Sequence, residues 1–371
     1  MSRHLHIVMH DVPWPVNFGG VTDLYHKVKC LHAAGIKIHL HCFVKKRPPQ
    51  TYLEKYCESL YYYERKTVSG FSLRLPYIVS SRKSAQLLEN LNKDDHPVLL
   101  EGVHCTYPLY SGALKNRKVF LRLHNIEHKY YAHLAANEDN LIKRLYFMNE
   151  ARLLNRYEAD IATKCPVWTV SLADAEEYRE AFHADAHFLP VFIPWDFPYA
   201  KEGKGKYCLY HGNLSVNENE KAASWLITAV FKDTDVPLVI AGQSPSSKLQ
   251  RQARKHKNIS LVKDPSETEM QKLIEDAQVN VLPSFNATGV KLKLLNALFN
   301  GRHCLVNKAG TEGSGLDELC NIAGTAGEFK VATAKLFQEP FSETKMQHRS
   351  AALRSLYNSE QNTKRIIAWI W

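Results

Sequence analysis

Short apolar runs alternate with amphipathic segments along almost the whole chain of 371 residues. Short apolar runs are typical of buried strands, and apolar positions three or four residues apart are typical of helices. The first half predicts strands at 4–10, 37–44, 98–100, 119–123 and 167–171, and helices at 23–34, 141–163 and 173–181, with Gly19 and Gly20 in a loop and Gly35 ending the first helix. Strands that alternate with helices predict a doubly wound parallel sheet of the α/β class.

A break in this pattern separates two such series. Residues 191–207 read V-F-I-P-W-D-F-P-Y-A-K-E-G-K-G-K-Y, and a stretch rich in proline, glycine and lysine is typical of a domain boundary. The second series predicts strands at 208–211, 238–241, 259–262 and 279–282, and helices at 219–231, 247–255 and 266–276. The sequence therefore predicts two Rossmann-like domains, 1–195 and 206–357, with a C-terminal helix at 358–371 that packs back on the first.

Residues 279–307 form the most informative segment, because they predict a strand, a loop, a helix and a second strand in succession. Gly289 opens the predicted helix and Gly301 closes it. The loop brings backbone amides and two lysines, Lys291 and Lys293, to a helix N-terminus, whose partial positive charge favours an anion. The sequence therefore predicts a phosphate site here. The alternative to a phosphate site is that both lysines lie on a solvated helix face, and at least one of the two is expected to point outward.

Composition narrows the class of protein. Hydrophobic residues make up 45% and charged residues 23%, which is typical of a globular enzyme. The mean hydropathy is −0.34 and no apolar run reaches the roughly 18 residues that a spanning helix needs. The chain enters its first strand without a signal-peptide core, so the expected location is the cytoplasm.

Charge and cysteine usage add two expectations. The formal net charge of +10 favours an anionic partner, but no nucleic-acid-binding motif is present, so no nucleic acid is expected. The eight cysteines stand singly, with no C-x-x-C pair, and are expected to be reduced thiols in the core.

Five segments, taken in order, resemble a known family. They are Gly19-Gly20 after the first strand, E-G-V-H at 101–104, R-L-H-N-I-E-H at 122–128, H-G-N-L-S at 211–215 and T-G-V-K-L-K-L-L-N-A-L at 288–298. Over nearly its whole length the chain resembles a glycosyltransferase of the GT-B fold, close to family 4 (group 1). The resemblance implies two Rossmann-like domains facing across a cleft, with a UDP- or GDP-sugar donor in the C-terminal domain and an acceptor against the N-terminal domain. It also implies retention of anomeric configuration, no bound cofactor or metal, and a glycan or lipid-linked acceptor in bacterial polysaccharide synthesis.

The resemblance also assigns candidate residues. The catalytic candidates are His124, Lys291 and Lys293, since fixed cations stabilise the charge on a departing diphosphate. The donor-binding candidates are Gly19, Gly20, Gly212, Asn213, Thr288, Gly289 and Asn296. The acceptor or sugar contacts are Glu101, His104, Asn125 and Glu127. For His124 the alternative is a core or capping histidine, and for the acceptor group it is helix capping or a salt bridge to Arg122.

One departure from the family's pattern leaves both the donor identity and the activity open. Many members carry two glutamates eight positions apart at this helix, where this chain has Thr288 and Asn296. Both replacements can form hydrogen bonds with a sugar or ribose, but the charge-assisted strength is lost. Two other functions therefore stay open: a nucleotide-sugar epimerase on the same fold, and a non-catalytic sugar-binding or scaffold partner.

One sequence motif is typical of a different class of enzyme, the zinc peptidases. His124 to His128 fit the pattern H-x-x-E-H, which needs both histidines on one helical face. Here the pattern straddles the end of a predicted strand, so no metal site is expected.

A peripheral membrane contact is a further expectation. An aromatic and basic segment suits the headgroup zone of a bilayer, with a strand packed in the domain as the alternative. Its members are Tyr61, Tyr62, Tyr63, Arg65, Lys66, Phe71, Arg74 and Tyr77. Such a contact would place the enzyme at the inner face of the membrane.

Overall fold

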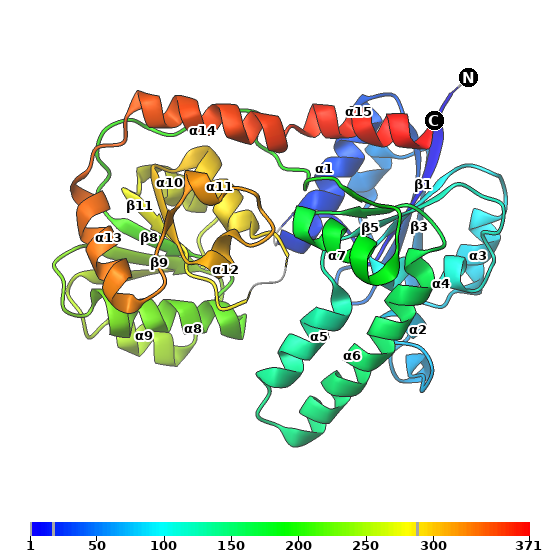
Figure 1. Ribbon diagram of the computed structural model, residues 1–371, viewed down its shortest axis with the longest axis horizontal. Coiled ribbons are helices and arrows are strands. Elements are labelled where there is room, and N and C mark those ends of the chain that lie inside the picture. Colours follow the sequence, from blue (N-terminus) through cyan, green and yellow to red (C-terminus); the bar gives the residue numbers. More distant parts are fainter. Residues whose placement is uncertain (1, 17–18, 287–288) are drawn as a thin grey trace. The chain divides into compact units, whose positions relative to one another are not determined.

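The computed structural model describes residues 2–16, 19–286 and 289–371. The chain forms two compact units, each built around its own sheet (Figure 1). The first contains the chain up to Pro194 together with Tyr357–Trp371, and the second is Trp195–Leu356.

Within the described residues, the first unit holds a parallel sheet of seven strands in the order β3-β2-β1-β4-β5-β6-β7. In chain order these are β1 (His4–Met9), β2 (Lys37–Val44), β3 (Ser59–Glu64), β4 (Val98–Glu101), β5 (Val119–Leu123), β6 (Val167–Thr169) and β7 (Ala186–Phe188). The strand order reverses between β1 and β4, and ligands bind at such a switch point, outside the carboxyl ends of the strands.

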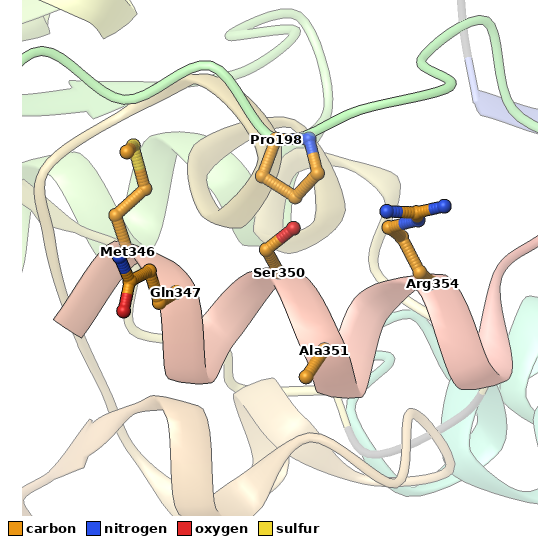
Figure 2. A pocket seen from close by; sticks show the side chains of 6 residues that line it. All are labelled: Pro198, Met346, Gln347, Ser350, Ala351 and Arg354. Atoms are coloured by element: carbon orange, nitrogen blue, oxygen red, sulfur yellow. The ribbon is translucent and has the colours of Figure 1, made fainter. Parts of the chain in front are cut away.

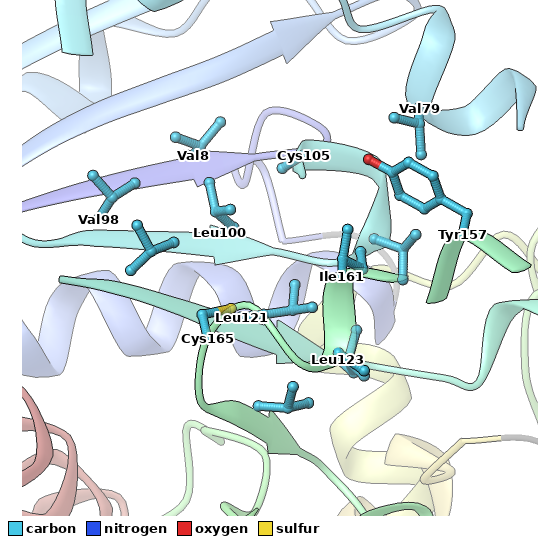
Figure 3. Close-up of a cluster of buried hydrophobic side chains, with 14 of the residues drawn as sticks. Val8, Val79, Val98, Leu100, Cys105, Leu121, Leu123, Tyr157, Ile161 and Cys165 are labelled. Atoms are coloured by element: carbon cyan, nitrogen blue, oxygen red, sulfur yellow. The ribbon is translucent and has the colours of Figure 1, made fainter. Parts of the chain in front are cut away.

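Both faces of this sheet are buried, which explains the continuous apolar runs in its strands. On β1, Val8 belongs to one core cluster, while Ile7 and Met9 belong to the cluster on the other face. In the first cluster, side chains of β1, β4 and β5 pack against Tyr157 and Ile161 of a long helix (Figure 3). The sheet is therefore the centre of a three-layer unit.

The helices of the first unit cover these faces. They are α1 (Gly19–Ala33), α2 (Tyr77–Ser80), α3 (Ala85–Leu91), α4 (Tyr107–Tyr110), α5 (Glu127–Ala136), α6 (Leu141–Ala162), α7 (Leu172–Phe182) and α15 (Ser359–Ile370). The terminal helix α15 lies beside α1 (Figure 1). Its Trp369 also packs against Trp168, with ring centroids 5.2 Å apart and the ring planes tilted by 38°. The loop predicted at Gly19 and Gly20 is wrong, because both residues belong to the first turn of α1.

The second unit repeats the architecture. Within the described residues its sheet has six parallel strands in the order β10-β9-β8-β11-β12-β13, so the reversal falls between β8 and β11. The strands are β8 (Cys208–His211), β9 (Leu238–Gly242), β10 (Ile259–Lys263), β11 (Val279–Val281), β12 (His303–Val306) and β13 (Asn321–Ile322). The helices are α8 (Asn217–Trp225), α9 (Ser247–Ala253), α10 (Glu267–Asp276), α11 (Leu292–Asn300), α12 (Lys308–Thr311), α13 (Ala326–Gln338) and α14 (Glu343–Leu356).

Two structural features lie near the switch point of the second unit. Gly242 ends β9 so close to β8 that a Cβ atom there would lie 1.9 Å from the carbonyl oxygen of Gly212, so no larger residue fits. The helix predicted at 219–231 begins earlier, at Asn217, and passes into a π-helical turn from Leu226 to Phe231.

Candidate functional site

A cavity of about 130 Å³ lies at the switch point of the second unit. Its lining comes from the segments that follow β8 and β11, the two strands between which the sheet order reverses. The lining residues are Glu218, Asn219, Pro283, Ser284, Phe285, Asn286, Lys291 and Lys293. This volume is smaller than that of a typical ligand pocket, so the cavity suits one polar group of a larger ligand.

Both lysines of the predicted phosphate site line this cavity. The expectation that one of them points outward is wrong, because α11 begins at Leu292 and Lys291 is its N-cap residue. Helical spacing therefore does not separate the two side chains. The Nζ of Lys291 donates to the carbonyl oxygen of Gly289 at 2.9 Å.

Lys293 enters the cavity from the first turn of α11. Its Nζ lies 3.2 Å from Oδ1 of Asn219 and 3.5 Å from the hydroxyl of Tyr210, whose ring it also faces. Burial, followed by the charge of Lys291, lowers the pKa of Lys293 to about 8. An anion in the cavity would offset both effects, because it supplies a counter-charge to a half-buried ammonium group.

The loop after β11 is fixed by side-chain hydrogen bonds. Asn307 accepts from the amide of Ser284 at 2.9 Å and donates to its carbonyl oxygen at 2.7 Å. Asn286 donates to a carboxylate oxygen of Glu218 at 3.2 Å, which links this loop to α8. The cavity wall therefore does not depend on the loop backbone alone.

The other described donor-binding candidates of the second unit lie on or beside the same two elements, β8 and α11. Gly212 and Asn213 follow β8, and the carbonyl oxygen of Asn213 accepts from Asn219, which lines the cavity. Gly289 has a φ of +66°, the left-handed conformation that glycine adopts easily. Asn296 is half-buried and accepts from Asn300 at 2.8 Å. Thr288 lies outside the described residues.

His211 ends β8 and was not assigned a role by the sequence reasoning. Its Nε2 is buried with no hydrogen-bond partner among the described residues. Burial and the nearby charge of Lys293 lower its pKa to about 3. The available signal was its place in the sequence, since a polar residue at a strand end before Gly212 stands at the ligand edge of the sheet.

A larger cavity of about 320 Å³ lies elsewhere on the second unit. It is formed by one face of α14 and the segment around Pro198 (Figure 2). Among the described residues that line it, Arg354 alone carries a charge, and its guanidinium packs over Phe197 at 5.1 Å. This lining offers little of the chemistry that a phosphate or a sugar needs.

In the first unit, a buried network of charges surrounds Asp23 on α1. Its carboxylate oxygens lie 3.0 Å from Nζ of Lys27, 3.1 Å from Nη2 of Arg122 and 3.0 Å from Nε2 of His124. Burial alone would raise the pKa of Asp23, but the charges of Arg122 and Lys27 outweigh it and hold the pKa well below its usual value. The network fixes α1 to β5.

His124 and Glu101 meet in this network. His124 directly follows β5, as the sequence predicted, and its Nε2 also lies 3.5 Å from a carboxylate oxygen of Glu101. Because Nε2 faces the two carboxylates, Nδ1 is the ring nitrogen left to meet a ligand. Glu101 is fully buried and pairs with Lys27 at 2.7 Å. The alternative pairing with Arg122 is wrong, since Arg122 bonds Asp23 instead.

Two more imidazoles lie next to His124. The ring of His10, which follows β1, lies 6.0 Å from that of His124 and 5.0 Å from that of His104. Burial, then the charge of Arg82, lowers the pKa of His104 well below its usual value, and its Nδ1 has no hydrogen-bond partner among the described residues. Neutral imidazoles of this kind both donate and accept, which suits hydroxyl groups.

Glu127 and its neighbour Glu158 control the start of α5. Glu158, on α6, accepts from the amides of Glu127 and His128, both at 3.0 Å. Burial, then the charge of Glu158, raises the pKa of Glu127 to about 8. Asn125 is half-buried in the short connection from β5 to α5.

Metal ligation by the H-x-x-E-H pattern does not fit this geometry. His124 bonds Asp23, whereas Nδ1 of His128 bonds Glu158 at 2.7 Å, so the two histidines face different partners. The ligand atoms of Asp23, Glu101 and His124 do lie within 4.8 Å of one another. Because Lys27 already meets both carboxylates, a cation there would be repelled by an ammonium group.

The aromatic and basic segment at 61–77 is mostly integrated into the fold. Tyr63 is buried in β3, and the hydroxyls of Tyr62 and Tyr77 bond backbone oxygens at 2.9 and 3.1 Å. Among the apolar side chains of this segment whose burial the structure describes, Phe71 and Leu73 are largely exposed. No described helix is long and apolar enough to cross a membrane.

Comparisons with known proteins agree with this architecture. The chain is similar to sucrose-phosphate synthase from Thermosynechococcus elongatus, with a TM-score of 0.72, 13% identity, and coverage of 100% of this chain and 98% of that one. It is also similar to an E. coli trehalose-6-phosphate structure bound with UDP-2-fluoro glucose, with a TM-score of 0.65, 10% identity, and coverage of 100% and 99%. The fold is that of the GT-B glycosyltransferases.

Sequence comparisons agree with the same family. Residues 205–339, within the second unit, match the family model described as Glycosyl transferases group 1. An uncharacterised 44.6 kDa protein in the cps region of Klebsiella pneumoniae is 27% identical over 328 residues, which cover 83% of this chain and 84% of that protein. The second unit therefore matches the group 1 glycosyltransferases, the family that the sequence motifs resemble.

Proposed function

We propose that this enzyme transfers one sugar, with retention of anomeric configuration, from a nucleoside diphosphate sugar to a glycan or lipid-linked acceptor in bacterial polysaccharide synthesis. The observation that carries the donor assignment is the convergence of Lys291 and Lys293 on one cavity at the switch point of the second unit. The cps-region relative supports the pathway class. The E. coli structure with UDP-2-fluoro glucose supports a uridine donor.

The two lysines serve the leaving group in this proposal. The bond between the anomeric carbon and the phosphate oxygen breaks as the bond to the acceptor oxygen forms. Its electron pair passes to the diphosphate, and the proton of the acceptor hydroxyl passes to the departing phosphate oxygen. Preorganised cations stabilise that charge without having to reorganise at the moment of reaction. Lys291 is held by Gly289, and Lys293 by Asn219, so both ammonium groups are in place before the ligand arrives.

The acceptor is assigned to the first unit. His124, held by Asp23, offers Nδ1 at the carboxyl edge of the sheet, and the neutral His104 packs against His10, whose ring also contacts that of His124. Asn125 and Glu127 follow on the same connection, so these side chains form a polar group suited to hydroxyls. Glu101 takes part through His124 and Lys27, because its own carboxylate is fully buried.

An anionic membrane surface is the proposed setting for a lipid-linked acceptor. The contact is assigned to the first two turns of α6 rather than to the segment at 61–77. Leu141, Leu145 and Met148 are 72%, 65% and 53% exposed and stand on one helix face, because they are spaced by four and three residues. Leu154, which is fully buried, lies nine residues after Leu145, about two and a half turns, and so on the opposite side.

The basic side chains on and beside this helix face favour an anionic bilayer as its partner. Arg152 and Arg156 continue the same stripe and are exposed, and the exposed Arg144 flanks its apolar end. Basic side chains beside an inserted apolar face are attracted to anionic headgroups. A second copy of the chain is a less favourable partner, because two chains of charge +10 repel each other.

A donor panel tests the proposed reaction. Purified enzyme is incubated with UDP- and GDP-sugars and with lipid or glycan acceptors, and the products are analysed by mass spectrometry and by NMR of the new anomeric carbon. Transfer with retained configuration is expected. An isomerised donor without transfer would instead indicate an epimerase. Nucleotide binding without any turnover would indicate a non-catalytic sugar-binding protein.

A further inference from the structure

Three histidines meet at the amino edge of the first sheet, the edge opposite His124. His4 begins β1, His39 is the third residue of β2, and His96 lies two residues before β4. Because these three strands are adjacent in the sheet, the side chains converge. One ring nitrogen from each lies within 4.8 Å of the others, and all three residues are half-buried.

Hydrogen bonds to two serines orient two of these rings. Nδ1 of His39 lies 2.8 Å from the hydroxyl of Ser59, and Nε2 of His4 lies 3.1 Å from the hydroxyl of Ser2. The remaining nitrogens, Nδ1 of His4 and Nε2 of His39, form a hydrogen bond with each other at 3.0 Å, which a bound metal ion would replace. Metal-bound histidines commonly donate their second ring N–H to an oxygen in this way. Two nitrogens on a four-coordinate zinc ion are separated by ~3.3 Å, given bonds of about 2.0 Å, which is close to this spacing.

In a neighbouring pair of histidines, every ring nitrogen has a hydrogen-bond partner within the protein. His6 and His41 bond each other at 2.8 Å. The second nitrogen of His6 bonds Asp94 at 2.9 Å and that of His41 bonds the hydroxyl of Tyr63 at 2.8 Å. This inner pair is buried and saturated by protein groups. The outer group contains the same kind of ring–ring hydrogen bond, between His4 and His39, but it adds a third ring, His96, stacked on His4 with centroids 4.5 Å apart, and it is only half-buried.

We propose that His4, His39 and His96 bind a divalent transition-metal ion, with zinc as the expected occupant and a water molecule as the fourth ligand. Imidazole nitrogens select zinc, copper or nickel over magnesium and calcium, which prefer oxygen ligands. Solvent exposure gives the ion access and leaves one coordination position open. The ion would fasten β1, β2 and the turn before β4 together, so its role is structural. This site is independent of the donor chemistry of the second unit.

Metal binding is measured on chain purified without a polyhistidine tag. After equilibrium dialysis against micromolar zinc, elemental analysis is expected to find one tightly bound ion per chain, and zinc is expected to raise the melting temperature. Magnesium is expected to do neither. Cobalt provides a spectroscopic check, because its visible absorption reports nitrogen coordination.

Four variants locate the ion. His39→Ala and His96→Ala are expected to lose it, and Ser59→Ala, which removes the orienting hydroxyl, is expected to weaken binding roughly 10- to 100-fold. His348→Ala, on the exposed face of α14, is the matched control and is expected to keep the ion. His124→Ala is expected to keep it too, which separates this site from the charge network around Asp23.

Two results would overturn the assignment. One is wild-type chain that binds no zinc and shows no zinc-dependent rise in melting temperature, a result that needs no variant to fold. The other is zinc that remains bound at unchanged affinity in both His39→Ala and His96→Ala. Neither result would bear on nucleotide binding by the second unit, so failure here is distinguishable from failure of the proposed reaction.

Discussion

Nζ of Lys293 lies 3.2 Å from Oδ1 of Asn219, although the two residues are 74 positions apart in the chain. The contact joins α11 to α8 across the switch point of the second sheet. An ammonium group has three hydrogens, and Asn219 takes one of them. The contact therefore holds the charge of Lys293 at the cavity while donor capacity remains for an incoming anion.

Replacing both lysines tests the phosphate cradle. Lys291→Ala and Lys293→Ala are each expected to weaken UDP binding about 10- to 100-fold, because a hydrogen bond to a charged group contributes roughly 1.5–3 kcal/mol. Calorimetry and thermal shift with UDP measure the effect. Lys248→Ala, on the exposed surface of α9, is the control. Unchanged UDP binding in the double variant would place the phosphates elsewhere.

The pH dependence of UDP binding follows from Lys293. Its pKa of about 8 in the free enzyme means that it is charged below pH 8 and neutral above. A bound diphosphate stabilises the charged form, so UDP affinity is expected to fall between about pH 8 and 9.5, by at most about tenfold per pH unit. Lys293→Arg is expected to remove this dependence, because a guanidinium stays charged throughout that range.

Proton uptake gives an independent check on the same group. Near pH 8.5, calorimetry in buffers of different ionisation enthalpy is expected to show that a proton enters the complex with UDP. A binding curve that is flat with pH and accompanied by no uptake would mean that Lys293 does not meet the ligand.

The network around Asp23 is expected to be essential for the stability of the first unit. Asp23→Asn leaves Lys27 and Arg122 buried without their shared counter-charge, and breaking a buried ion pair costs about 3–5 kcal/mol. Urea unfolding measures the loss. Asp139→Asn, at an exposed position before α6, is expected to change little. Equal stability of these two variants would show that the network contributes little.

The raised pKa of Glu127 predicts that the free energy of unfolding depends on pH. Its pKa is raised to about 8 in the folded chain, so the folded state holds a proton that the unfolded state has already released above its usual value of 4.5. The stability contributed by that proton is therefore lost as the pH rises toward and through 8, by at most about 1.4 kcal/mol per pH unit. Glu127→Gln is expected to flatten this slope between pH 6 and 8, whereas the exposed Glu180→Gln keeps it.

The exposed face of α6 is expected to bind anionic vesicles. A variant with serine at Leu141, Leu145 and Met148 is expected to lose flotation with such vesicles by more than about tenfold, since each buried apolar side chain contributes roughly 1.5–3 kcal/mol. Leu172→Ser, which removes an exposed leucine from α7, is the matched control. A triple variant that floats normally but changes its oligomeric state would assign the face to a second copy instead.

The sequence by itself determined the two-unit α/β plan. The strands at 37–44, 119–123 and 208–211 were predicted with the bounds that the structure shows. These strands are short continuous apolar runs, since both faces of the sheet are buried, and such runs are visible without any tertiary information. The family motif at 288–298 was equally visible in the sequence, because its residues are consecutive.

Only the tertiary structure decided which distant side chains meet. Asp23 reads as an ordinary helix residue, yet it joins Lys27, Arg122 and His124, because the fold brings α1 against the end of β5. Lys291 and Lys293 share a cavity because Lys291 precedes the helix, a boundary that periodicity could not fix. Local patterns report which residues are buried. Which charged side chains pair depends on the order of the strands in the sheet. Local patterns in the sequence do not specify that order.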